Sequence, residues 1–157
     1  MTDLEPLASF PALVRAYVAS VPEARWRERP AAGGFAMVEQ AWHLADLEHD
    51  GFGQRIARLV RDAEPELPDF RGQQVAQERG YLELEMAPAL ERFAVARAAN
   101  VETLRSLSPD AWQRSGRQEG VGVVTLEQVV VRMAEHDREH AGEIEALLRE
   151  LAGSPVS

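Results

Sequence analysis

The segment "TLEQVVVRMAEHDREHAGEIEALLREL", residues 125–151, has apolar residues at the three- and four-residue spacing of an α-helix. Thr125 to Gln128 have the form of a capping box, in which the threonine and glutamine side chains satisfy backbone N–H groups of the first turn. The segment therefore predicts a helix from residue 125 to about residue 151. A second element must cover its apolar stripe, which consists of Leu126, Val130, Met133, Ile144, Leu147 and Leu151.

Three earlier segments show the same periodicity, and we expect helices at about residues 10–21, 36–61 and 88–107. Residues 74–86 also allow a helix. The one strand candidate is short, "GVGVV" at residues 120–124. Four helices with one apolar face each bury those faces best when they pack side by side. The pattern predicts an all-α protein with a four-helix bundle, and we interpret residues 1–157 as one domain.

The composition excludes several kinds of chemistry. The chain has no cysteine, which rules out disulfides, thiolate zinc sites and a cysteine nucleophile. All 17 basic residues are arginine, so a Schiff-base lysine is also ruled out. The chain carries a net charge of −9, and we therefore expect no nucleic-acid partner. No segment has the length and apolar content of a membrane span or a secretion signal, so we expect a cytoplasmic protein with no membrane partner.

Two histidines, His136 and His140, lie four residues apart in the last predicted helix. This spacing puts both imidazoles on one face, with Cβ atoms roughly 5–6 Å apart. They are either two ligands of one metal ion or two polar residues of a helix surface, and the choice depends on a third ligand.

Two metal-site motifs do not fit. The stretch "HDREH" matches an inverted zinc-protease motif, but only 17 residues follow His140, too few for the rest of a protease site. A dimetal carboxylate bundle would use Asp46 with His49 and Asp137 with His140, together with an acid on each remaining helix. The predicted first helix offers no acid.

A mononuclear site with three histidines remains, and its third ligand would come from the second helix, which contains both His43 and His49. Helical periodicity favours His49, because it falls on the apolar stripe with Val38, Trp42 and Phe52. The residues alone do not choose between the two.

Several stretches closely resemble the DinB/YfiT-like superfamily, chiefly "GGFAMVEQAWHLADLEHDGFGQRIARLV" (33–60) and "GVGVVTLEQVVVRMAEHDREHAGEI" (120–144). The resemblance implies a four-helix bundle with a long crossover between its second and third helices, and "EPELPDFRGQQ" (64–74) fits that crossover. It also implies a metal site at His43, His136 and His140, and so selects His43 over His49.

The resemblance further implies a divalent metal, with zinc as the first expectation and nickel, manganese or iron as alternatives. Three neutral imidazoles would leave positions open for a small-molecule substrate. Such an ion activates water for hydrolysis, or a low-molecular-weight thiol such as bacillithiol or mycothiol for S-transfer. We also expect a homodimer. The alternative is a non-enzymatic dimeric binding or stress-response protein with a vestigial metal site.

Each ligating imidazole needs an acceptor for its second nitrogen. The carboxylates within one helical turn are Glu39 and Asp46 for His43, Glu139 for His136, and Glu143 for His140. Asp137 lies near the centre of the apolar stripe and needs a partner if it is buried, for which Arg97 of the third helix is a candidate.

Overall fold

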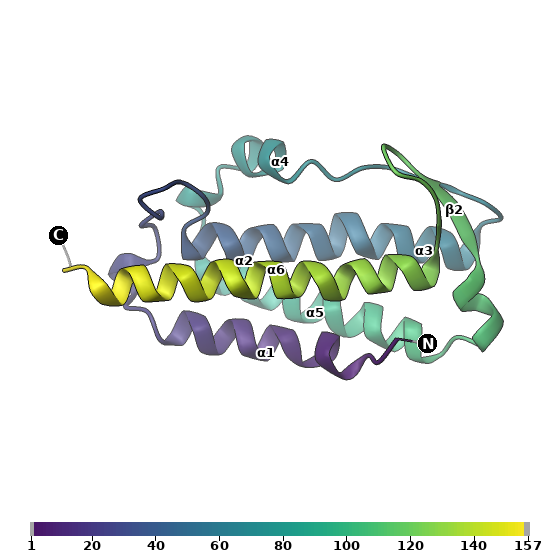
Figure 1. Cartoon of the computed structure of the whole chain (residues 1–157), viewed down its shortest axis with the longest axis horizontal. Coiled ribbons are helices and arrows are strands. Elements are labelled where there is room, and N and C mark those ends of the chain that lie inside the picture. The colour runs from purple at the N-terminus through teal and green to yellow at the C-terminus, as the bar shows by residue number, and fades with distance from the viewer. Residues whose placement is uncertain (1, 156–157) are drawn as a thin grey trace.

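In the computed structural model, which describes residues 2–155, four long helical segments pack as a bundle (Figure 1). The first is α1 (Glu5–Ala19), and the second is formed by α2 (Met37–Asp46) and α3 (Gly53–Arg61). The third and fourth are α5 (Met86–Arg105) and α6 (Leu126–Gly153). Figure 1 shows α1 and α6 running in one direction, and α2, α3 and α5 in the other. The predicted all-α four-helix bundle is confirmed.

Helix α1 begins five residues earlier than the sequence analysis expected, at Glu5. A proline in the first turn, Pro6, suits a helix start because the N–H groups there have no helical acceptor. Pro11 lies inside the helix and cannot donate to the carbonyl of Leu7. The guanidinium of Arg97 donates to that carbonyl instead, at 2.9 Å.

The second helical segment contains a π-helical turn, η2 (Leu47–Phe52), between α2 and α3. A π-turn holds one residue more than an α-turn, so the side chains beyond it are rotated relative to a regular helix. Periodicity counted from Val38 across this turn therefore gives the wrong face for residues within and after it.

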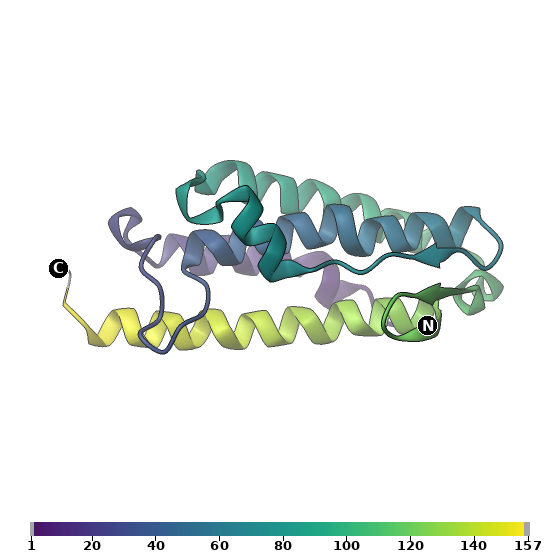
Figure 2. The same ribbon diagram turned by 90° about the horizontal axis from the view of Figure 1, so that it is seen from above.

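The chain from residue 62 to residue 85 forms the long crossover that the family resemblance implies. It contains α4 (Gly72–Arg79) and the short helix η3 (Tyr81–Glu83), which together replace the single helix that residues 74–86 allowed. Figures 1 and 2 show the crossover lying along α2 and α3. All ten residues of α2 are consequently buried.

A small sheet covers one end of the bundle. Strands β2 (Ser115–Gln118) and β3 (Gly122–Thr125) form a hairpin, and β1 (Glu66–Leu67) from the crossover pairs in parallel with β2. The candidate strand at residues 120–124 overlaps β3. Strand β2, with the sequence SGRQ, has no apolar residue that could have signalled it. Two further 3-10 helices, η1 (Glu23–Arg25) and η4 (Pro109–Gln113), complete the connections.

Helix α6 begins with the predicted capping box. The backbone N–H of Gln128 donates to the Thr125 hydroxyl at 3.1 Å, and the backbone N–H of Thr125 donates to the Gln128 side chain at 2.9 Å. At the other end of α6, the loop before α2 reaches across to it (Figure 2), and the backbone N–H of Ala31 donates to Glu150.

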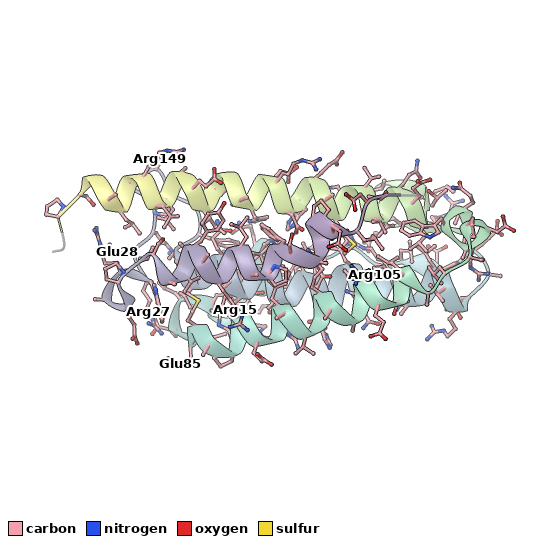
Figure 3. The ribbon with its side chains drawn as sticks, turned by 90° about the horizontal axis from the view of Figure 1, so that it is seen from below. Arg15, Arg27, Glu28, Glu85, Arg105 and Arg149 are labelled. Atoms are coloured by element: carbon pink, nitrogen blue, oxygen red, sulfur yellow. The ribbon has the colours of Figure 1, made fainter. Side chains whose placement is uncertain are left out.

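Exposed ion pairs join α1 and α5, and Figure 3 labels one arginine of each helix, Arg15 and Arg105. Arg15 of α1 pairs with Glu91 of α5, and Arg105 of α5 pairs with Glu5 of α1. All four side chains are exposed, and exposed pairs contribute little to stability. The buried apolar faces, rather than these ion pairs, hold α1 on α5.

The core consists of two apolar clusters separated by a layer of buried polar side chains. On α5, Phe93 and Val101 belong to different clusters, and Arg97 lies between them in the sequence. On α6, Met133 and Ile144 likewise belong to different clusters, and buried polar residues lie between them in the sequence. Within residues 2–155, no helix is long and apolar enough to cross a membrane.

Candidate metal centre

Three histidines meet between α2 and α6. His43 comes from α2, and His136 and His140 come from successive turns of α6. One ring nitrogen from each lies within 4.8 Å of the others, and the Nε2 atoms of His43 and His136 are 3.3 Å apart. The ring centroids are separated by 4.2 Å to 5.3 Å. The structure thus brings together the three residues that the family resemblance selected.

Burial keeps these imidazoles neutral. Removal from water, with a smaller effect of neighbouring histidines, lowers the pKa of His43 to about 3 and that of His136 to about 2. The pKa of His140 is also lowered, again mainly by burial. At neutral pH all three therefore offer lone pairs, the form in which histidine binds a metal ion.

His140 is held by an amide that the sequence analysis did not single out. Its Nδ1 lies 2.7 Å from Oε1 of Gln40, an oxygen that can only accept a hydrogen bond. Nδ1 therefore carries the proton, and Nε2 keeps a lone pair that can bind a metal ion. Glu143 lies 3.2 Å from the same Nδ1 and accepts from the Gln40 amide at 2.9 Å. Gln40 lies one turn before His43 on α2, and only the packing of α2 against α6 brings it to His140.

The environment of His43 is different. Its Nδ1 is buried and has no hydrogen-bond partner among residues 2–155. Gly72, the first residue of α4, lies against the ring, and the Phe35 ring lies nearby in a tilted arrangement with a centroid separation of 5.4 Å. The Nε2 atoms of two neutral imidazoles only 3.3 Å apart suit the coordination of a cation, whereas in the described part of the chain Nδ1 of His43 lacks an acceptor such as the one Gln40 gives His140.

Of the four carboxylates expected to orient the imidazoles, Glu143 contacts one. Glu39 instead accepts two hydrogen bonds from Arg29, and Glu139 accepts from Arg132. These two acids lie within one helical turn of a histidine, but their side chains serve ion pairs away from it.

Asp46 is fully buried and forms a separate network. Its carboxylate accepts hydrogen bonds from the Tyr81 hydroxyl at 2.7 Å and from Arg92 at 3.0 Å, and it pairs with Arg79 at 3.2 Å. This network joins α2 to the crossover and to α5. Asp46 therefore fixes the crossover over α2 and does not orient His43.

His49, which helical periodicity favoured, lies outside the triad. Its side chain is about half exposed, and Nδ1 lies 2.7 Å from the carboxylate of Asp50. The periodicity argument was wrong because residue 49 lies in the π-turn and because the crossover buries the face of α2 that carries His43. The pairing of Asp46 with His49 in a dimetal site is excluded by the same placement.

Asp137 forms the ion pair with Arg97 that the sequence analysis suggested. The guanidinium donates to both carboxylate oxygens, at 2.7 Å and 2.9 Å, and also to both oxygens of Glu48. Burial raises the pKa of Asp137 to about 6, although Arg97 acts in the opposite direction. This network links η2, α5 and α6 beside His136, so Asp137 positions the helix that carries two of the histidines.

A cavity of about 630 Å³ opens beside the triad. Its walls include His43, His140, Gln40 and Glu143, together with Phe35 from the loop before α2. This volume suits a small organic molecule. A substrate in the cavity would lie against two of the three histidines.

Comparison with known proteins shows the family of the chain and a solved structure with the same fold. Residues 7–144 match the DinB superfamily. The solved structure of YfiT from Bacillus subtilis, described as a probable metal-dependent hydrolase with an unusual four-helix bundle topology, superimposes with a TM-score of 0.87. The match covers 96% of this chain and 86% of that chain at 17% sequence identity, which shows a shared fold. The search of curated proteins gave no match.

Proposed function

Because this chain belongs to the DinB superfamily, we propose that it is a metal-dependent enzyme whose His43, His136 and His140 hold one divalent cation. The observation that carries the proposal is the convergence of three neutral imidazoles, two buried and one half-buried, beside a cavity of substrate size. Structural metal sites are closed by protein ligands, whereas catalytic sites keep a position open.

The donor set favours zinc, with nickel, manganese and iron as alternatives, because imidazole nitrogen is a ligand that first-row transition metals share. A cation held there would supply Lewis acidity and lower the pKa of a water molecule or thiol beside it. Its charge would not be neutralised by the three ligands.

The residues around the triad would prepare it for this role. Gln40 fixes the ring of His140 by its 2.7 Å hydrogen bond, so one donor atom is oriented before any ion binds. Phe35 and Gly72 pack on His43 and keep water from that side of the ring. Glu143 lines the cavity and offers a carboxylate that could accept a proton from the attacking water or thiol.

Two reactions are compatible with this arrangement. Hydrolysis would use water as the nucleophile, as the description of YfiT as a probable metal-dependent hydrolase suggests. S-transfer would use a low-molecular-weight thiol, whose sulfur displaces a leaving group from an electrophilic carbon. Both require the same triad and the same open position.

We would test the proposal with zinc-loaded protein, using 4-nitrophenyl acetate for hydrolysis and 1-chloro-2,4-dinitrobenzene with bacillithiol, mycothiol or cysteine for S-transfer. We expect turnover in one of the two assays that is lost in the His43→Ala, His136→Ala and His140→Ala variants. The matched control is His49→Ala, which removes an exposed histidine outside the triad and should retain activity. Equal rates in all four variants and the unaltered protein would refute the proposal.

A further inference from the structure

Arg55 of α3 is buried without an ionic partner. The residue is 6% exposed, and its Nε has no hydrogen-bond partner among residues 2–155. No carboxylate among residues 2–155 forms an ion pair with Arg55. Its guanidinium carbon lies 5.4 Å from the centre of the Phe52 ring. A buried cation in such surroundings is unfavourable unless something compensates its charge.

The two other arginines that are buried within residues 2–155 are compensated. Arg97 pairs with Glu48 and Asp137. Arg25 pairs with Glu28 at 2.6 Å and donates to backbone carbonyls at the end of α6. Arg55, in contrast, has no carboxylate in the described part of the chain that compensates its charge. The protein therefore contains an arginine whose hydrogen-bonding capacity is free for a ligand.

Arg55 lines a second cavity of about 460 Å³, which lies between α3, α6 and the β2–β3 hairpin. Most of the wall is apolar, formed by Phe52, Val129 and the hairpin valines Val121 and Val123. Both hairpin valines are more than 60% exposed. The cavity thus combines one buried cation with apolar surface that remains accessible.

This second cavity adjoins the candidate metal centre. The ring of Phe52 lies 5.8 Å from the ring of His136, and its centre lies 5.4 Å from the Arg55 guanidinium carbon. A molecule bound at Arg55 would therefore lie one aromatic ring away from the triad.

We propose that Arg55 binds the carboxylate of a small ligand whose apolar body lies against Phe52 and the hairpin valines. A guanidinium and a carboxylate form two parallel hydrogen bonds, and the pairing is strongest where water is excluded. The ligand class is a monocarboxylate with an alkyl or aryl chain. That this ligand is a substrate for the triad rests on the function proposed above, whereas the binding site itself does not need the metal.

Burial lowers the pKa of Arg55, and the negative charge of Asp69 has the opposite, smaller effect of raising it. Asp69 forms no ion pair with Arg55; its backbone N–H and carboxylate interact with Glu119 and Arg71 instead. A ligand carboxylate would supply the close negative charge that Asp69 does not.

The test uses metal-free protein and two pairs of ligands, octanoate with octanamide and 4-phenylbutyrate with 4-phenylbutanamide, measured by calorimetry or NMR titration. The acid and the amide of each pair differ in charge but have nearly the same shape. We expect each acid to bind at least tenfold more tightly than its amide, which corresponds to the strength of a charge-assisted hydrogen bond. The variant Arg55→Gln should lose this preference and leave amide binding unchanged.

Arg132→Gln is the matched control, because Arg132 lines the same cavity but already pairs with Glu135 and Glu139. It should change acid affinity less than threefold. The variant lacking all three triad histidines should bind the acids normally, so a failure of the metal-site proposal leaves this test intact. Circular dichroism checks that Arg55→Gln folds; if it does not, the acid and amide affinities of the unaltered protein decide.

Three results would overturn the proposal. The first is equal binding, or no binding, of acid and amide by the unaltered protein. The second is loss of the acid preference in Arg132→Gln but not in Arg55→Gln. The third is loss of acid binding in the triple histidine variant, which would place the carboxylate at the triad.

Discussion

The ring of His43 packs against the α-carbon of Gly72, so closely that a β-carbon at residue 72 would lie 2.8 Å from Cε1 and 3.1 Å from Nδ1. Gly72 begins α4 in the crossover, and His43 lies in α2. The absence of a side chain at residue 72 lets the crossover cover the candidate metal centre, which explains why this face of α2 is buried.

The variant Gly72→Ala should therefore weaken metal binding. The added methyl group must push either the His43 ring or the start of α4 out of place, because a contact of 2.8 Å is far below van der Waals distance. We expect zinc affinity to fall at least tenfold in a chelator-competition titration. Gly142→Ala on α6 is the control, since a methyl group there meets open space and should leave affinity unchanged. Unchanged affinity in Gly72→Ala would contradict this account of the crossover.

Replacement of Gln40 by leucine should reduce metal affinity without unfolding the protein. The substitution removes the acceptor that holds Nδ1 of His140, and loss of such an outer partner typically costs about 10- to 100-fold in metal affinity. The same chelator competition measures it. Gln74→Leu, which alters an exposed glutamine on α4, is the control. Equal affinities of the two variants would show that Gln40 does not orient the site.

Two of the three arginines that are buried within residues 2–155, Arg97 and Arg55, should respond in opposite ways to replacement by methionine. Arg97→Met leaves Glu48 and Asp137 buried without their cation, and we expect a loss of about 3–5 kcal/mol in the free energy of unfolding. Arg55→Met removes an unpaired buried charge and should leave stability unchanged or raise it. Urea unfolding of metal-free protein measures both. Similar losses would mean that Arg55 has a structural partner after all.

The stability of the metal-free protein should fall with decreasing pH. An unfolded histidine titrates near pH 6.5, whereas burial lowers the pKa of His43 to about 3 and that of His136 to about 2. Below pH 6.5 the unfolded chain thus binds protons that the folded chain does not, and each such histidine should cost up to about 1.4 kcal/mol per pH unit until the pH approaches 3.

The variant lacking all three triad histidines should show a flatter dependence on pH in urea unfolding between pH 7 and pH 4. Asp137, whose pKa burial raises to about 6, acts in the opposite direction, because its folded form gains protons first as the pH falls. It is present in both proteins and cancels in the comparison. Superimposable pH profiles would contradict the burial of neutral histidines, and His49→Ala should leave the profile unchanged.

Much of the fold could be predicted from the sequence, because the helices depend on local periodicity and capping. The capping box at Thr125 was found from four residues, and the ion pair between Asp137 and Arg97 followed from the position of an acid on an apolar stripe. Strand β2 could not be found in this way, since it is held by its neighbours β1 and β3 rather than by an apolar pattern.

The site was harder to predict for two physical reasons. A π-turn rotates the helix at His49, and periodicity cannot register an extra residue in a turn. The burial of His43 and the role of Gln40 depend on contacts with the crossover and α6, which are distant in the sequence. The family resemblance supplied what periodicity could not. The homodimer and the cytoplasmic location remain predictions.

The most direct test of the central claim is elemental analysis of untagged protein, after incubation with zinc and removal of free metal. The account predicts about one zinc ion per chain in the unaltered protein and in His49→Ala, and none in the variant with His43, His136 and His140 replaced by alanine. Equal metal content in the unaltered protein and the triple variant, or negligible content in both, would contradict it.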